Sequence, residues 1–364
     1  MTVLTLKTRV IIKALFSLCT VYLIYRIIYE FCIWGRYGSD FLSNIVISSH
    51  EIKKDRFEFL SKAKGADWPQ HVKSIYDGNS PAINPHPYKF IINEPNKCRN
   101  EDGSIKEVFL LVLVTSIHKN TALRRTDRET WASQSEIEGK SIITLFLLAN
   151  PSKGGTHHQV SVDKESALHH DIIMGDFQDS YKNLTLKTVM GMKWVSQFCP
   201  HVRYVLKTDD DMIVMYENLV RYLSSPAVPP KNFVSGIVVR AEPVRNEISK
   251  WYVPENIYPQ AWYPPFCSGS GYVMSGDVAR NVYEVSTHTP YLYLEDVFMG
   301  FCLFQLGVYP LASSQFHNNR VDYSTCVYRR LFTTHYSKAA IAVRENLWRQ
   351  VMKDKQTHCY LYFL

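Results

Sequence analysis

Three features that often decide a function are missing from this sequence of 364 residues. It has no CxxC pair, which argues against a zinc site. It has no long block of Lys and Arg, and its formal net charge of +7 is modest for the length, so nucleic-acid binding is not indicated. No small-residue cleavage site follows the apolar N-terminal stretch. What remains, 46% hydrophobic and 21% charged residues, is the composition of a globular protein.

The N-terminal segment 10–34 is apolar apart from three charged residues. Its uninterrupted part, 14–25, is too short to span a bilayer, but Lys13 and Arg26 can snorkel and extend it to roughly 20 residues. We predict an uncleaved signal anchor over 10–34, with a cleaved signal peptide as the rival. The basic residues before it place the tail, 1–9, in the cytoplasm and the rest of the chain in the lumen.

The chain past the anchor divides into two parts. Residues 35–106 lack sustained periodicity and are rich in Pro and Asn, which predicts a stem or linker. In 107–364, apolar runs typical of buried strands alternate with helical patterns, which predicts one α/β domain with a mostly parallel sheet. We expect strands within 107–116, 141–150, 171–174, 202–206 and 232–239, and helices within 186–198 and 217–224.

Three consecutive carboxylates, Asp209, Asp210 and Asp211, follow the predicted strand 202–206. Ligands of open α/β sheets bind beyond the carboxyl ends of the strands, and Mg²⁺ and Mn²⁺ prefer carboxylate oxygens. The triplet therefore predicts a divalent-cation site that would hold something anionic. A solvated turn is the alternative, because acidic clusters are usually exposed and idle.

Two later segments add candidates. The stretch 251–276 is rich in aromatic residues and Pro, and its Gly269 and Gly271 would let the backbone approach a ligand closely. Its candidates for stacking on a sugar ring are Trp262, Tyr263 and Tyr272. A rigid loop with buried aromatics is the alternative. Further on, Glu295 and Asp296 again follow an apolar run, although adjacent acids are also common at helix N-termini.

The order and wording of these segments resemble the β-1,3-glycosyltransferase family, glycosyltransferase family 31, which includes β-1,3-galactosyltransferases and β-1,3-N-acetylglucosaminyltransferases. The resemblance covers roughly 107–359 as a succession of motifs. They are the Arg-rich RxTW motif at 124–131, a block at 170–188, the metal motif at 207–211, the YP…CxGxGY loop at 263–272, the EDV..G motif at 295–300 and the YRR…H block at 328–335. Two residues depart from the pattern: Asp127 stands where the family usually has an apolar residue, and Ala132 where Gly often follows the Trp.

The resemblance implies a GT-A fold and inverting, Mn²⁺-dependent transfer from a UDP-sugar donor to a glycan acceptor on lipid or protein. It implies metal ligation by the triplet, with Asp211 the first candidate and His335 an additional ligand; a hydrogen-bonded surface histidine is the alternative for His335. It also implies that Asp296 is the general base and that Glu295 orients the loop or acceptor, with the reverse assignment open. The candidates for contacting the nucleotide sugar are Arg124, Arg128, Lys207, Asp209, Gly269 and Gly271.

Arg124 and Arg128 have a structural alternative, a surface helix that pairs with Glu129. The motif wording favours galactose as the transferred sugar, with N-acetylglucosamine and N-acetylgalactosamine as alternatives. Two rival functions are an inactive, membrane-anchored glycan-binding protein and a metal-dependent phosphoryl hydrolase. Two intact acidic motifs argue against the first, and the lack of an evident water-activating arrangement argues against the second.

The compartment follows from the anchor and the cysteines. The resemblance and topology together predict a single-pass type II protein of the Golgi membrane. Six cysteines lie beyond the anchor, an even set facing an oxidising lumen, which predicts disulfides with the connectivity left open. One sequon, at Asn183, predicts N-glycosylation, and steric hiding within the motif block is the alternative.

Overall fold

A computed structural model describes residues 81–151, 156–336 and 341–356. The predicted tail, the anchor and the first part of the stem lie outside these ranges. Within them, no helix has the length and apolar character needed to cross a bilayer.

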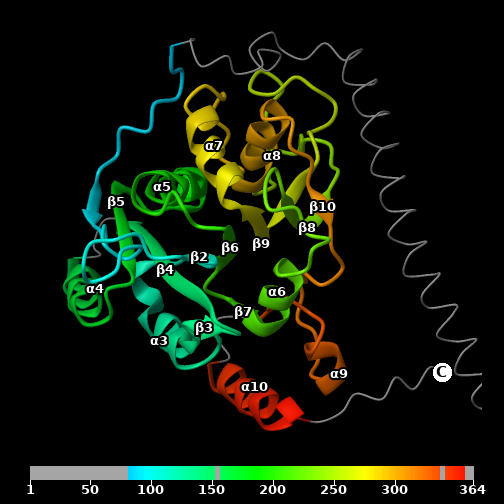
Figure 1. Ribbon diagram of the computed structural model, residues 1–364. Helices are drawn as coiled ribbons and strands as arrows, with labels where there is room; N and C mark the ends of the chain where they lie inside the picture. Colours follow the sequence, from blue (N-terminus) through cyan, green and yellow to red (C-terminus); the bar gives the residue numbers. More distant parts are fainter. Residues whose placement is uncertain (1–80, 152–155, 337–340, 357–364) are drawn as a thin grey trace, which may run out of the picture. The chain divides into compact units, whose positions relative to one another are not determined.

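Most of the described strands join one mixed sheet, ordered β1-β5-β4-β2-β6-β9-β8-β10, with β3 attached to β4 (Figure 1). A separate pair is formed by β7 and β11. The strands are β1 (Phe90–Ile92), β2 (Leu110–Thr115), β3 (Glu136–Ile137), β4 (Lys140–Asn150), β5 (Ile172–Gln178), β6 (Tyr204–Asp209), β7 (Met212–Val214), β8 (Val234–Val239), β9 (Phe266–Ser275), β10 (Leu311–Ala312) and β11 (Thr333–His335).

The helices of the described chain connect and flank these strands. They are α3 (Thr121–Glu129), α4 (Thr156–His169), α5 (Leu184–Phe198), α6 (Tyr216–Leu223), α7 (Gly276–Ser286), α8 (Glu295–Gln305), α9 (Thr325–Tyr328) and α10 (Ile341–Lys353), with short 3₁₀ turns between some elements. The expected α/β domain is confirmed, but its sheet is mixed and not mostly parallel. Strands β5, β4, β2 and β6 pair in parallel, whereas β9 pairs antiparallel with β6 and β8.

One face of the parallel strands packs against α5. Side chains alternate between the faces of a strand, so Leu113 of β2 and Leu147 of β4 point to the same side. A Cβ on Gly191 of α5 would lie 2.8 Å from Leu147 Cδ1 and 3.0 Å from Leu113 Cδ1, so the helix touches the sheet here at close range. In Figure 1, α7 and α8 lie beside α5 on this side.

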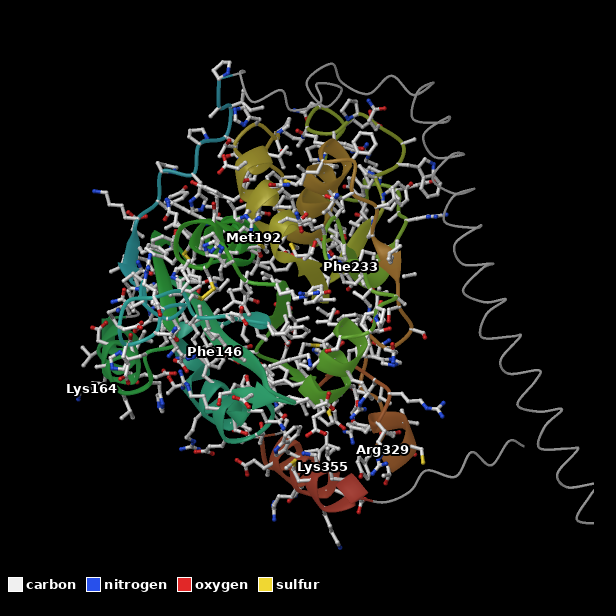
Figure 2. All side chains as sticks on the ribbon, viewed as in Figure 1. Phe146, Lys164, Met192, Phe233, Arg329 and Lys355 are labelled. Atoms are coloured by element: carbon white, nitrogen blue, oxygen red, sulfur yellow. A yellow bond between two sulfur atoms is a disulfide. The ribbon has the colours of Figure 1, made fainter. Side chains whose placement is uncertain are left out.

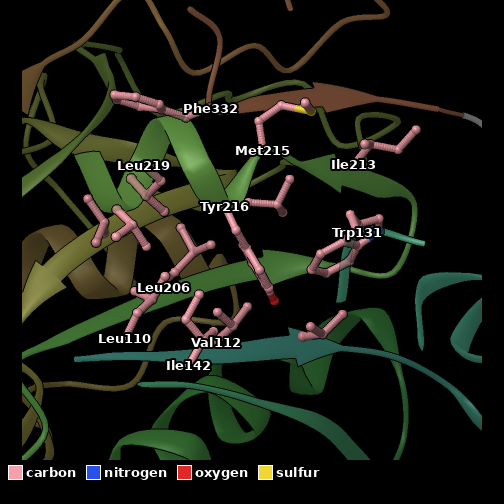
Figure 3. Close-up of a cluster of buried hydrophobic side chains, with 14 of the residues drawn as sticks. Leu110, Val112, Trp131, Ile142, Leu206, Ile213, Met215, Tyr216, Leu219 and Phe332 are labelled. Carbon is pink, nitrogen blue, oxygen red and sulfur yellow. The ribbon is translucent and has the colours of Figure 1, made fainter. Parts of the chain in front are cut away.

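The opposite face carries a hydrophobic core cluster (Figure 3). There Tyr216 of α6 points at the strands and meets Trp131 edge to face, with ring centroids 5.5 Å apart. Both are fully buried over Val112 and Ile142 of the sheet. The buried Tyr216 hydroxyl is satisfied by Thr144 Oγ1 at 2.7 Å, as buried polar groups require.

Apolar side chains lie in the interior and charged side chains at the periphery, as the sequence pattern predicts. Figure 2 shows Phe146 and Met192 within the packed layers, and both are fully buried. Lys164 and Lys355 are exposed at the edges of the same view. Burial of apolar side chains on both faces of β2 and β4 explains why these strands read as continuous apolar runs.

The end of the predicted stem belongs to the folded domain. Residues 90–92 form β1, which pairs antiparallel with β5 at the sheet edge. Cys98 forms a disulfide with Cys199, directly after α5. The predicted boundary at residue 106 is therefore too late, because short segments held by one edge pairing and a disulfide show little hydrophobic periodicity.

The prediction of disulfides is confirmed for Cys98–Cys199, and Cys326 is disulfide-bonded as well. Cys267 and Cys302 are free and buried. Burial raises the pKa of each of these two thiols to about 12, so they stay protonated and unreactive.

Candidate active site

The acidic triplet lies at the end of β6, where the chain turns before β7. Asp209 is the last residue of β6, and Asp210 and Asp211 form the turn. Asp210 is buried, and its Oδ2 accepts hydrogen bonds of 2.7 Å from Ser116 Oγ and 2.7 Å from Asn120 Nδ2. Asp210 therefore anchors the turn, while its two neighbours remain partly exposed.

Asp211 faces His335 across the β7–β11 pair. His335 Nε2 lies 3.4 Å from Asp211 Oδ2, and the two side chains are 36% and 24% exposed. The pairing of Met212 with His335 in antiparallel register fixes this approach. Among the described residues no three His, Cys, Asp or Glu side chains form a ready-made metal cage. A carboxylate and an imidazole are nevertheless donors that Mn²⁺ accepts, and such ions often complete their shell with substrate phosphates.

Lys207 joins the two acidic motifs. Its Nζ lies 2.9 Å from Asp209 Oδ1 and 3.5 Å from Glu295 Oε2, and it donates to Gly269 O at 2.6 Å. Burial lowers the pKa of Lys207, but the carboxylates of Asp209 and Glu295 outweigh it and raise the pKa above its ordinary value. The ammonium therefore stays charged, and motifs far apart in the sequence border one site.

Glu295 and Asp296 are the first two residues of α8, so they do occupy a helix N-terminus. Glu295 is buried, and its Oε1 accepts a 2.7 Å hydrogen bond from Tyr272 Oη. Asp296 is half-buried; its Oδ1 accepts from Val297 N at 2.9 Å and its Oδ2 from Gly269 N at 3.4 Å. Burial raises the pKa of both carboxyl groups.

The two predicted glycines serve the packing of this site. A Cβ on Gly269 would lie 2.9 Å from Glu295 Oε2, so only glycine lets β9 pass this close to the carboxylate. Gly271 is buried and pairs with Thr208 of β6. The structure thus places Gly269 beside Glu295 and Asp296, whereas Gly271 packs near Thr333, Phe316 and Thr208.

Comparison with known proteins identifies the family of this chain. A sequence profile described as Galactosyltransferase matches residues 122–313, which include the RxTW, triplet and EDV motifs. The chain is 42% identical over 278 residues to beta-1,3-galactosyltransferase 1 of Mus musculus and of Homo sapiens, covering 76% of this chain and 82% of each relative. This chain belongs to the galactosyltransferase family. The motif resemblance is confirmed.

A second member of the galactosyltransferase family, beta-1,3-galactosyltransferase 2 of Mus musculus, is 40% identical over 281 residues, which is 76% of this chain and 65% of the relative. Among solved structures, galactosyltransferase LgtC in complex with donor and acceptor sugar analogs shows a distant likeness. It covers 70% of this chain and 98% of its own, with a TM-score of 0.35 and 11% identity.

Of the three predicted stacking residues of this family member, only one is exposed to solvent. Tyr272 is buried against Glu295. Tyr263 is also buried and packs on Tyr258, with the two ring centroids 5.0 Å apart. The aromatic side chains of these two residues are therefore buried, as the alternative expected, but Tyr272 belongs to strand β9 and only Tyr263 to the loop before it. Trp262 is 55% exposed.

Another set of aromatic residues gathers around Lys250, and we call Tyr181, Trp251 and Tyr293 the aromatic surface. Lys250 Nζ lies 5.8 Å from the Tyr181 ring centroid and 4.7 Å from that of Trp251. Tyr293 Oη donates to Lys250 O at 3.1 Å, which holds the segment against α8. Burial and then the charge of Asp296 raise the pKa of Tyr181, as expected from its nearness to that carboxylate. Sequence reasoning missed this set because its members come from three separate segments.

Arg124 and Arg128 brace the domain in place of the predicted nucleotide contact. Arg124 is fully buried, and its Nε and Nη2 donate to Glu165 at 2.8 and 2.6 Å. Arg128 donates to Glu165 at 2.7 Å and to Asp171 at 2.7 Å. The alternative of a surface pairing with Glu129 does not describe them either. They tie α3 to α4 and to the start of β5, and unpairing such buried charges is costly.

The sequon of this galactosyltransferase lies at the start of α5. Asn183 Nδ2 donates to Gln178 O at 2.8 Å, and the buried Thr185 hydroxyl donates to Leu292 O at 2.7 Å. The glycosylation of Asn183 stays a prediction.

Proposed function

We propose that this protein is an inverting β-1,3-galactosyltransferase that moves galactose from UDP-galactose to a hydroxyl group of a glycan acceptor. The observation that carries the proposal is the bridge from Asp209 through Lys207 to Glu295, which brings a metal-binding motif and a candidate base to one site. The similarity to β-1,3-galactosyltransferases supports the donor and the linkage. The mixed sheet, with the triplet at the end of β6, supports a GT-A arrangement.

On the donor side, Asp211 and His335 would hold a divalent cation, Mn²⁺ by the family resemblance, with Asp209 beside them. That ion would neutralise the negative charge that develops on the departing diphosphate. Asp210 does not reach the ion in this proposal, since its side chain holds the turn through Ser116 and Asn120. Its role is to keep the neighbouring carboxylates in place.

On the acceptor side, Asp296 is the base. As the acceptor oxygen bonds to the anomeric carbon and the bond from that carbon to the diphosphate oxygen breaks, Asp296 takes the hydroxyl proton. One displacement converts an α-linked donor into a β-linked product. Glu295 is less suited to this step, because its carboxylate is buried between Tyr272 and Lys207.

The aromatic surface provides a place for the acceptor. Tyr181 and Trp251 are about half-exposed, and Tyr181 is near enough to Asp296 for that charge to raise its pKa. An amphipathic ring such as that of tyrosine or tryptophan can pack on the C–H face of a sugar. Tyr293 is only three residues before Asp296, so a sugar packed here lies within reach of the base. Trp262, which is also exposed, is a further contact candidate.

We further propose that the enzyme is a single-pass type II protein of the Golgi membrane with its catalytic domain in the lumen. The apolar segment 10–34 and its basic flank support the topology. The Cys98–Cys199 disulfide supports an oxidising compartment.

A donor panel tests the function. The purified protein is incubated with Mn²⁺ and UDP-galactose, UDP-N-acetylglucosamine or UDP-N-acetylgalactosamine, with and without glycan acceptors. We expect acceptor-dependent transfer of galactose. The absence of transfer in every pairing, by a folded protein that binds UDP, would contradict a transferase and favour a glycan-binding protein.

A further inference from the structure

We propose that Arg344 on α10, held by Asp127 on α3, is a positioning residue for the metal-binding turn. It fixes the backbone on both sides of Asp211 and so aims the carboxylate of that residue. The inference rests on the proposed function in one respect, namely that Asp211 is a metal ligand.

Arg344 donates hydrogen bonds to backbone carbonyl groups of the turn. Its Nη1 donates to Asp210 O at 2.8 Å, and its Nη2 donates to Met212 O at 2.7 Å. The carbonyl between them, Asp211 O, accepts from Tyr336 N at 2.8 Å. Three successive carbonyl groups of the turn are thus bound by the C-terminal part of the chain, so the turn has little freedom to rotate.

Asp127 holds the guanidinium that does this. Its Oδ1 lies 2.5 Å from Arg344 Nη2 and also accepts from Trp131 Nε1 at 2.9 Å. Asp127 and Arg344 are 0% and 1% exposed, so neither has an alternative partner in solvent. Burial raises the pKa of Asp127, and the charge of Arg344 opposes that shift.

Asp127 and Arg344 depend on each other because both are buried. A carboxylate buried within the RxTW motif requires a buried cation beside it. Arg344 supplies that cation from α10, far along the sequence, and its two Nη groups also donate to the carbonyls of Asp210 and Met212. An apolar residue at 127 would leave the guanidinium without its anchor.

Positioning can be separated from stability by replacing both partners. Removing one member of a buried ion pair strands the other charge, but replacing both with apolar side chains of similar volume is often neutral for stability. The test variant is therefore Asp127→Leu combined with Arg344→Met. It removes the grip on the turn without leaving an unpaired charge.

The measurement is UDP binding by calorimetry with and without Mn²⁺, together with Mn²⁺ binding followed by electron paramagnetic resonance. We expect a folded protein with a lower unfolding temperature, because Trp131 Nε1 and the carbonyls of Asp210 and Met212 lose their hydrogen-bond partners. Its Mn²⁺ affinity should fall by about 10- to 100-fold, the usual effect of removing a group that orients a metal ligand. UDP binding in chelator should not change.

Lys193→Met is the matched control. Lys193 Nζ also donates to two backbone carbonyls, Tyr88 O at 2.7 Å and His86 O at 3.3 Å, but on α5 beside β1. Its substitution removes a comparable grip elsewhere and should leave Mn²⁺ affinity unchanged.

A folded double variant with unaltered Mn²⁺ affinity would overturn the inference. If the double variant does not fold, Arg344→Lys decides: lysine keeps the charge beside Asp127 but lacks the rigid fork that reaches both carbonyls, so Mn²⁺ affinity should still fall. Normal affinity in that variant would also overturn the inference. Absence of Mn²⁺-dependent UDP binding in the unaltered protein would instead contradict the proposed function.

Discussion

Adjacent carboxyl groups at the start of α8 have different environments. Glu295 is buried and bound by Tyr272 and Lys207, whereas Asp296 is half-buried and accepts hydrogen bonds from the backbone N–H groups of Val297 and Gly269. The first is fixed by its neighbours, and the second remains open to a ligand. The sequence alone left the order of these roles undecided, because both residues are acids at neighbouring positions.

Substitution Asp296→Asn tests the assignment of the base. The amide keeps the size of the side chain but cannot take a proton, so kcat should fall by about 10² or more. UDP binding in Mn²⁺ should be nearly unchanged. Glu295→Gln is the comparison, and a larger loss of kcat in it, with Asp296→Asn still active, would reverse the two roles.

The acid limb of the pH profile follows from the same site. Burial raises the pKa of Asp296, and a base works only when ionised, so kcat/KM should decline as the pH falls through this raised pKa. The decline should begin above the ordinary aspartate value of about 3.9. UDP binding measured over the same range is the control; an acid limb at or below pH 4 would speak against a buried base.

Asp211→Asn separates the donor side from the acceptor side. Loss of the carboxylate charge should weaken UDP binding in Mn²⁺ while leaving binding in chelator unaltered, because only the metal-dependent part of the affinity is lost. Calorimetric titration with UDP measures both. An unchanged affinity in Mn²⁺ would remove Asp211 from the ligand set.

At the scale of elements, the strands buried on both faces were predictable and β9 was not. The continuous apolar runs of β2 and β4 mark them clearly. β9 contains Gly269, Ser270 and Gly271 within an aromatic, Pro-rich stretch that is typical of a loop. Its place between β6 and β8 depends on long-range pairing, and that pairing buries Tyr272, a choice between burial and exposure that the local pattern left open.

The disulfide Cys98–Cys199 ties the segment after β1 to the end of α5. It closes a loop across a sequence separation of 101 residues. Replacing both cysteines by Ala should lower the free energy of unfolding by about 2–5 kcal/mol, measured by denaturant titration. Cys302→Ala, which removes a buried thiol without a cross-link, should cost less; equal losses would mean that packing and not the cross-link matters.

At the scale of the whole molecule, the motif order predicted the family, which is confirmed. The partners of the buried charges were not predictable. Arg124 pairs with Glu165 and Arg344 with Asp127, and in each case only the folded chain brings the partners together. Arg124 was therefore predicted to contact phosphate, because its carboxylate partner Glu165 could not be identified from the sequence.

The claim that both acidic motifs serve one direct displacement makes a stereochemical prediction for the whole enzyme. The purified protein is supplied with Mn²⁺, UDP-α-galactose and a glycan acceptor, and the new linkage is examined by nuclear magnetic resonance. We predict a β-anomeric galactose at position 3 of the acceptor sugar, because a single attack opposite the leaving diphosphate inverts the anomeric carbon. An α-linked product would contradict the account, since retention requires a second displacement or a different geometry of attack.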